Sequence, residues 1–185
     1  MKFIYSILCL SIVFAACEEK HEYHDDSAHE KFVKNSETVL ANLEGWQNES
    51  VDYSQYAADF VMQGTGYGES DSISLDDMIK MDKHFWASYD FKIVSDSINL
   101  LPGVNAETKK ADGSVRHYTD WEVTLSATDS TEAKSGVIKL YESFDFNDEG
   151  KIIFQQTYGD FTGLMMHLHG GGDHDMDMYA DDDDD

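Results

Sequence analysis

The sequence predicts an α+β domain, with helices in its first half and an antiparallel sheet in its second half. Three observations carry this prediction. Apolar residues recur at helical spacing up to Trp86, they recur at nearly every second position from Phe91 onward, and turn-forming residues separate the later segments. Helices followed by a run of strands are typical of an α+β domain with an antiparallel sheet. Of the 185 residues, about 140 lie between polar ends, which suits one domain.

The helical half contains three expected helices and one short strand. Apolar residues between Phe32 and Trp46 fall near helical spacing, which predicts the first and longest helix. Ser74, with Asp77 three residues later, resembles a capping box and opens the last helix. Gly64 follows the short strand and ends it. In chain order the expected helices cover residues 27–47, 52–58 and 74–86, and the short strand covers residues 60–62.

The second half is expected to consist of four strands. Residues 115–125 alternate cleanly, with His117 and Trp121 on one face and charged residues on the other. Pro102 and Gly103 should end the preceding strand. Residues 147–150 should form a hairpin turn, because glycine supplies the positive φ that such a turn needs. The expected strands cover residues 91–101, 115–125, 137–146 and 151–158.

Residues 1–16 have the composition of an export signal. Lys2 precedes an apolar run that extends from Phe3 to Phe14, and small residues follow it up to Cys17. The alternative is a transmembrane anchor, but a spanning helix needs about 20 apolar residues and this run is shorter. A cysteine directly after small residues resembles the lipobox of bacterial lipoproteins, in which the signal is removed and the cysteine acylated. We therefore expect palmitate-type lipidation of Cys17 and an exported protein anchored to the cell envelope, at the outer membrane or the cell surface.

Charge divides the remaining chain into three parts. The sequence has 37 acidic and 13 basic residues, a net charge of −24. A polar tether (17–31) and an acidic tail (170–185) hold about half of this charge, and the expected folded domain (32–169) is acidic too. Nucleic acids and anionic lipids bind basic surfaces, so neither is expected as a direct partner. Because Cys9 lies in the signal and Cys17 is expected to be lipidated, no disulfide is expected.

The order of the segments resembles the nuclear-transport-factor-2-like superfamily, also called SnoaL-like. The matching pieces are the paired strands near 115–125 and 136–146, and the motifs Tyr56-Ala57-Ala58-Asp59-Phe60, Phe85-Trp86 and Tyr158-Gly159-Asp160. The resemblance implies a strongly curved sheet that wraps around the long first helix as a cone with an apolar pocket. Members include isomerases, dehydratases, cyclases, epoxide hydrolases and non-catalytic binding modules. It also implies a homodimer formed through the sheet face.

The family layout suggests which side chains line the pocket. The candidates share an aromatic ring and a place on a predicted inner face. They are Trp46, Tyr53, Tyr56, Phe60, Phe85, Trp86, His117, Trp121, Phe144 and Tyr158. The alternative is that these rings only pack the core, because aromatic residues bury large areas without any ligand.

Two classes of function stay open for this pocket. The first is a membrane-anchored module that binds a small apolar ligand or a partner protein. The second is a SnoaL-like enzyme of isomerase, dehydratase or cyclase type, with His117, Asp90 and Asp160 as the acid–base candidates. The resemblance places Gly64 where ketosteroid isomerases of the superfamily carry their aspartate base, which favours the binding module. We expect no cofactor.

Metal ligands crowd the C-terminal end of the chain. Imidazole suits zinc, copper or nickel, and carboxylates suit calcium or magnesium. The alternative is a solvated tail, and the spacing matches no closed metal site. The candidates for weak metal binding are His167, His169, Asp173, His174 and Asp175.

Overall fold

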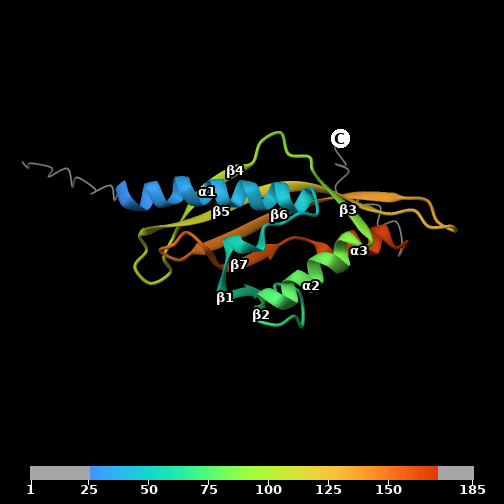
Figure 1. The fold of residues 1–185 in the computed structure, drawn as a ribbon. Coiled ribbons are helices and arrows are strands. Elements are labelled where there is room, and N and C mark those ends of the chain that lie inside the picture. The colour runs from blue at the N-terminus through green and yellow to red at the C-terminus, as the bar shows by residue number, and fades with distance from the viewer. Residues whose placement is uncertain (1–25, 171–185) are drawn as a thin grey trace, which may run out of the picture.

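A computed structural model describes residues 26–170 of the chain. The first helix, α1 (Asp26–Gln47), lies lengthwise against the longest strand, β5 (Ala111–Leu125), which pairs with β6 (Lys134–Phe146) (Figure 1). The prediction of a helix at 27–47 is therefore confirmed. The start of α1 lies within the segment expected to be a tether (17–31). Residues 17–25 of that tether lie outside the residues that the structure describes.

The chain after α1 departs from the prediction of a second helix. Only Tyr53–Gln55 forms a 3₁₀ turn (η1), and β1 (Tyr56–Gln63) starts at once, so the expected short strand is longer than predicted. Strand β1 pairs in parallel with β7 (Ile152–Tyr158), almost 100 residues later in the chain. This pairing between distant segments outweighs the weak local helical pattern. The sheet is largely antiparallel, and β1 and β7 form its parallel pair.

The second α-helix starts where the sequence predicts. Strand β2 (Ile73–Ser74) pairs with β1 and leads into α2 (Leu75–Trp86). The Ser74 side chain caps the helix by accepting a hydrogen bond from the backbone N–H of Asp77. Helix α2 and the last helix, α3 (Phe161–Leu168), lie together near one end of the sheet (Figure 1).

The expected strand at 91–101 is two strands. Strands β3 (Tyr89–Ile93) and β4 (Asn99–Val104) both pair with β5, the first near its end and the second near its start. The polar residues between them interrupt the apolar pattern. Pro102 and Gly103 do not end β4, because β4 has no partner on its outer side and an edge strand tolerates a proline without an N–H donor.

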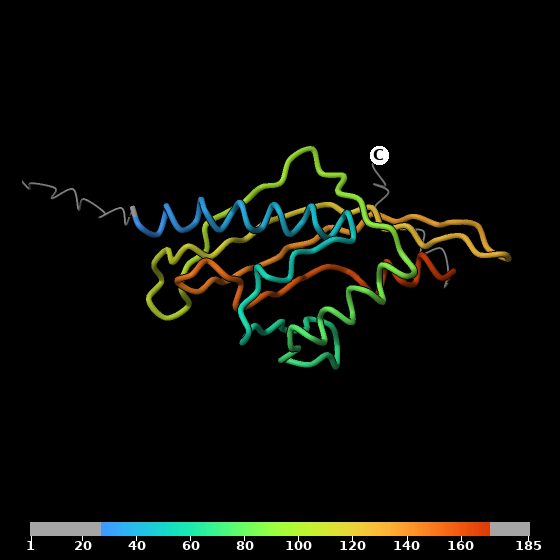
Figure 2. Tube along the Cα trace, in the orientation of Figure 1, coloured from blue at the N-terminus to red at the C-terminus, as the bar shows by residue number. Residues whose placement is uncertain are grey.

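The sheet curves around α1 and the two shorter helices. Its strand order is β2-β1-β7-β6-β5-β3, with β4 also on β5. Figure 2 shows β5 and β6 running the length of the molecule, with their connecting loop projecting beyond the helices. The inner faces of these strands and α1 form one buried core, which includes Val39, Leu43, Val115, Trp121 and Phe144. The predicted α+β class with a curved sheet is thus confirmed.

Candidate functional site

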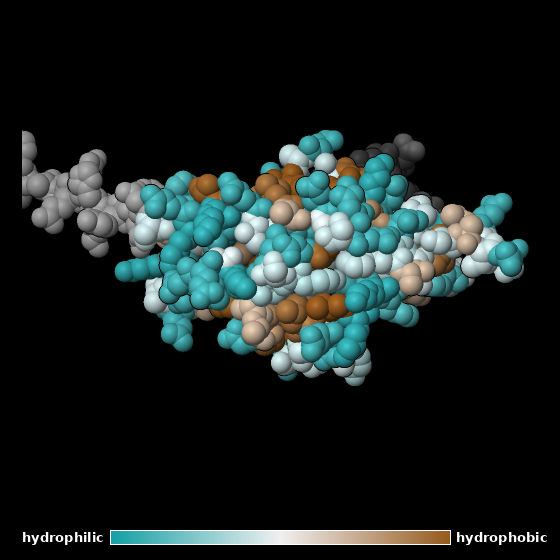
Figure 3. All heavy atoms as spheres, viewed as in Figure 1, coloured by the Kyte–Doolittle hydropathy of each residue, from teal (hydrophilic) through white to brown (hydrophobic). Residues whose placement is uncertain are grey.

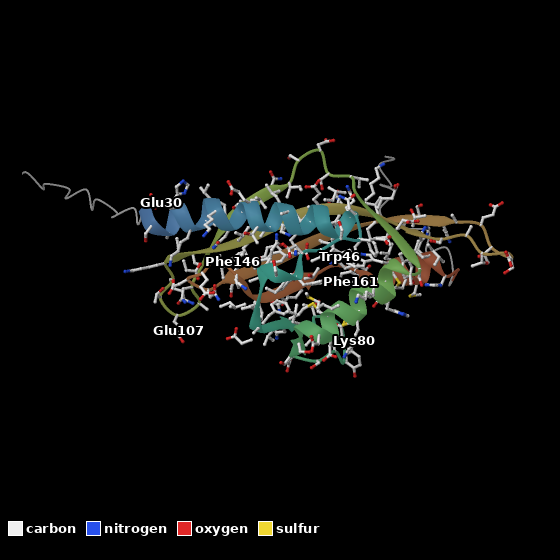
Figure 4. All side chains as sticks on the ribbon, in the orientation of Figure 1. Glu30, Trp46, Lys80, Glu107, Phe146 and Phe161 are labelled. Atoms are coloured by element: carbon white, nitrogen blue, oxygen red, sulfur yellow. The ribbon has the colours of Figure 1, made fainter. Side chains whose placement is uncertain are left out.

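A cavity of about 400 Å³ lies between the inner face of the sheet, the end of α1, and helices α2 and α3. Its walls are mostly apolar. Aromatic rings form much of them, and these are Trp46, Phe85, Tyr89, Phe91, Trp121 and Phe161. In Figure 4, Trp46 and Phe161 lie near α2, whereas Phe146 and Glu107 lie toward the opposite end of the sheet. Figure 3 shows hydrophobic side chains gathered in a band along the lower part of the same view, at the level of α2.

Asp82 brings a carboxyl group into the apolar wall from α2. It lies one turn after Met78, so helical spacing directs both side chains inward, and Asp82 is 5% exposed. Tyr53 donates a hydrogen bond to Asp82 Oδ2 at 2.9 Å. Burial raises the pKa of Asp82 from 3.8 to about 6, and the hydrogen bond from Tyr53 opposes the rise. Asp82 therefore changes its charge near pH 6.

A second set of polar side chains connects α1 to the sheet through hydrogen bonds. The Asn42 amide donates to the Tyr56 hydroxyl at 2.9 Å, and that hydroxyl donates to Gln155 Oε1 at 3.2 Å. Asn42 and Gln155 line the cavity, while Tyr56 lies behind them. Burial raises the pKa of Tyr56 well above its usual range. The Tyr56 phenol therefore stays protonated and holds the two amide side chains in place.

A third group centres on Glu142, which faces the cavity from β6. Thr157 donates to Glu142 Oε1 at 2.8 Å, and His117 Nε2 lies 3.1 Å from Oε2, although this contact is not aligned as a hydrogen bond. His117 is fully buried, and its other ring nitrogen lies 3.2 Å from the Thr119 hydroxyl. Glu142 is 7% exposed. Its carboxylate is thus held from two sides, with His117 behind it and the cavity in front.

The predicted pocket residues separate into three sets. Those that line the cavity are Trp46, Phe85 and Trp121. Those that lie behind its walls, in contact with lining side chains or in the core, are Tyr53, Tyr56, Phe60, Trp86, His117 and Phe144. Tyr158 does neither: Thr157 faces the cavity, so the alternation of β7 turns Tyr158 outward, where it is 48% exposed and packs near Tyr141.

The acid–base candidates are also placed apart. His117 reaches the cavity only through Glu142. Asp90 is exposed on β3. Asp160 is exposed as well, and its carboxylate accepts a hydrogen bond from the N–H of Gly163, so it caps α3. Asp90 and Asp160 therefore do not share one site with His117.

Sequence reasoning missed the polar residues of the cavity. Asn42, Asp82, Glu142 and Gln155 each occupy an inward position in an otherwise apolar helix face or strand face. Glu142, for example, follows Ile138 and Leu140 in the alternation of β6. A polar residue at a core position of an apolar pattern was the signal that could have identified them.

The metal candidates do not form a site within residues 26–170. His167 contacts the backbone oxygen of Ser135 at 3.1 Å, and His169 contacts the Tyr89 hydroxyl at 2.7 Å. No group of three metal-ligating side chains exists among the described residues. Asp173, His174 and Asp175 lie outside them, as do Cys17 and the signal. Within the described part, no helix has the length and hydrophobicity needed to cross a membrane.

Known proteins match this chain in fold and not in sequence. No family model and no curated protein matches it. A protein assigned as a polyketide cyclase from Xanthomonas campestris superposes with a TM-score of 0.60 at 15% identity, over 75% of this chain and 98% of that chain. A protein assigned as a SnoaL-like polyketide cyclase from Shewanella denitrificans superposes with a TM-score of 0.51 at 11% identity, over 75% of this chain and 98% of that chain. An LEH-like epoxide hydrolase from M. tuberculosis superposes with a TM-score of 0.51 at 15% identity, over 75% of this chain and 92% of that chain.

The chain therefore has the fold of these structures, the nuclear-transport-factor-2-like fold that its segment order predicts. Two of the matched proteins are assigned as cyclases and the third is an LEH-like epoxide hydrolase, and each is covered almost completely. At such low identities the likeness establishes the fold, and the activity has to be argued from the site itself.

Proposed function

We propose that this chain is an exported, lipid-anchored protein whose cavity binds a small and mostly apolar molecule. The cavity carries the proposal. It has a volume of about 400 Å³, aromatic and aliphatic walls, and a few polar groups held by internal hydrogen bonds. Small-molecule sites in proteins have this composition and a size in this range. Rings that only filled the core would leave no such space.

Ligand binding is tested with two matched tryptophan variants. Met81 lines the cavity and is 37% exposed, whereas Met166 is 45% exposed and does not line it. Met81→Trp places a large ring in the cavity at little cost to folding, because Met81 is partly exposed. We expect a small molecule to co-purify with the native chain and with Met166→Trp, and to be absent from Met81→Trp. Mass analysis of the extracted protein measures this.

Two results of this experiment would contradict ligand binding in the cavity. Equal ligand content in the two variants would show that the molecule binds elsewhere. A native chain free of any bound small molecule would argue against a ligand-binding role of the cavity.

The lipid anchor rests on residues 1–17. A basic start, a short apolar run and small residues before Cys17 support export and acylation. Two or more acyl chains give stable membrane attachment, so no spanning helix is needed. Labelled palmitate should enter the native chain and not a Cys17→Ser variant. Equal labelling of both would refute acylation at Cys17.

An acid–base enzyme is the second candidate function, and one observation favours it. Two carboxyl groups, Asp82 and Glu142, face the same cavity in different surroundings: a tyrosine contacts the first, and a threonine and a histidine contact the second. Carboxyl groups in unlike environments serve as separate acid and base in many enzymes. Incubation of the recovered ligand with the chain, followed by chromatography, separates the two functions: a binding protein returns it unchanged and an enzyme returns a product.

A further inference from the structure

We propose that the molecule bound in the cavity is an apolar amine, with a positively charged amino group directed at Asp82 and Glu142. This inference rests on the proposed binding function and names the chemical class of the ligand. The lining residues include three carboxylates, namely Glu69, Asp82 and Glu142, and they include no Lys, Arg or His. The cavity is therefore negative as well as apolar.

Asp82 is the carboxylate with the least compensation. It is 5% exposed, Tyr53 donates to its Oδ2, and Oδ1 has no partner among residues 26–170. No Lys or Arg of these residues forms an ion pair with it. A largely buried carboxylate without a cation is costly, because it has lost much of its water and gained no opposite charge. An ammonium group from a ligand would supply both the charge and the missing hydrogen-bond donors.

The hydroxyl groups around the cavity already form hydrogen bonds inside the protein. The Tyr53 hydroxyl donates to Asp82, and the Thr157 hydroxyl donates to Glu142. The Tyr56 hydroxyl donates to Gln155, and the Asn42 amide donates to Tyr56. A ligand with a carboxylate or phosphate would therefore meet like charge and no cationic side chain in the lining. A ligand that itself donates hydrogen bonds finds carboxylate oxygens ready to accept them.

The walls suit the rest of such a molecule. Trp46 is fixed by edge-on contacts with Trp86 and Phe91, at ring-centre distances of 5.4 and 4.7 Å, so its ring is held in place. Trp121 and Phe85 add further rings. Aromatic faces attract cations, tryptophan most strongly, and they also cover apolar surface. A cavity with aromatic walls and buried carboxylates thus fits an amine on an apolar body better than a neutral or acidic molecule.

Three probes of one shape test the charge preference. Tryptamine carries an ammonium group, tryptophol a hydroxyl group and indole-3-acetate a carboxylate, each on the same indole body. The full chain is titrated with each probe by calorimetry at pH 7.5. We expect tryptamine to bind at least about 10-fold more tightly than tryptophol, because hydrogen bonds to a charged group are stronger than those between neutral groups. Indole-3-acetate should bind most weakly.

Two matched substitutions locate the effect. Asp82→Asn keeps the shape of the side chain and removes its charge, so tryptamine should lose about 10-fold or more in affinity while tryptophol changes little. Asp90→Asn removes an exposed charge outside the cavity and should change neither. Equal binding of tryptamine and tryptophol, or equal losses in both variants, would overturn the amine and leave the cavity as a site for neutral ligands. Failure of all three probes to bind would overturn the binding function as well.

Discussion

Replacing Asp82 with Asn should stabilise the empty protein at neutral and alkaline pH, by up to about 3 kcal/mol. The reason is the cost of the buried charge. Burial raises the pKa of Asp82 from 3.8 to about 6, and each pKa unit corresponds to about 1.4 kcal/mol. Because the pKa is higher in the folded state, the folded chain binds the proton more tightly between these two values. Stability from protonated Asp82 is therefore complete below about pH 4 and is lost as the pH rises through 6.

The measurement is urea unfolding of both proteins from pH 4 to pH 8. The native chain should lose stability relative to Asp82→Asn across this range, and the two should be close at pH 4. Asparagine keeps an oxygen that accepts the hydrogen bond from Tyr53, so the comparison isolates the charge. Asp90→Asn serves as the control, since Asp90 is exposed on β3. A difference between native chain and Asp82→Asn that does not vary with pH would contradict the assigned cost of the charge.

This expected gain in stability bears on function. A protein that keeps a destabilising carboxylate in its apolar wall gains nothing from it in the empty state. Buried polar groups that cost stability often belong to functional sites. The charge acquires a use when a ligand supplies the opposite charge. The stability measurement and the amine titration therefore examine the same side chain from two directions.

Local pattern predicted the elements whose own apolar spacing is long and regular. Helix α2 has an amphipathic face and a serine cap, and β5 and β6 alternate over long runs, so all three were expected close to their observed bounds. Strand β1 was shortened in the prediction because its pairing with β7 depends on residues almost 100 positions away. Helix α3 was not expected. It is short and packs over β6, where Gly136 leaves space for Leu164.

The walls of the site were more predictable than its polar groups. Trp46, Phe85 and Trp121 were expected in the pocket, because large rings on inward faces have few other places to lie. The carboxylates were not expected. Asp82 belongs to α2 and Glu142 to β6, and only the curvature of the sheet brings the two to one cavity. That curvature depends on pairings across the whole chain, which local spacing does not contain.

Phe144→Ala should cost about 3–5 kcal/mol of stability, the largest loss expected for a single substitution here. Phe144 is fully buried on β6 and stands opposite Val115 of β5. Its ring stacks on His117 at a centre distance of 5.8 Å and an interplanar angle of 18°. Alanine would leave a cavity directly beneath the histidine that supports Glu142. Urea unfolding measures the loss, with the native chain as reference.

Phe161→Ala is the matched control, because Phe161 lines the cavity but is 43% exposed and should cost only about 1 kcal/mol. Equal losses in the two variants would contradict the location of the core beneath β5 and β6.

The two positions also distinguish a side chain that contacts a bound ligand from one that only supports the cavity wall. Phe161→Ala removes a wall that touches a ligand and should weaken binding while folding is nearly unchanged. A smaller substitution, Phe144→Leu, should lower stability and leave the lining side chains in place, so binding measured well below its melting temperature should persist.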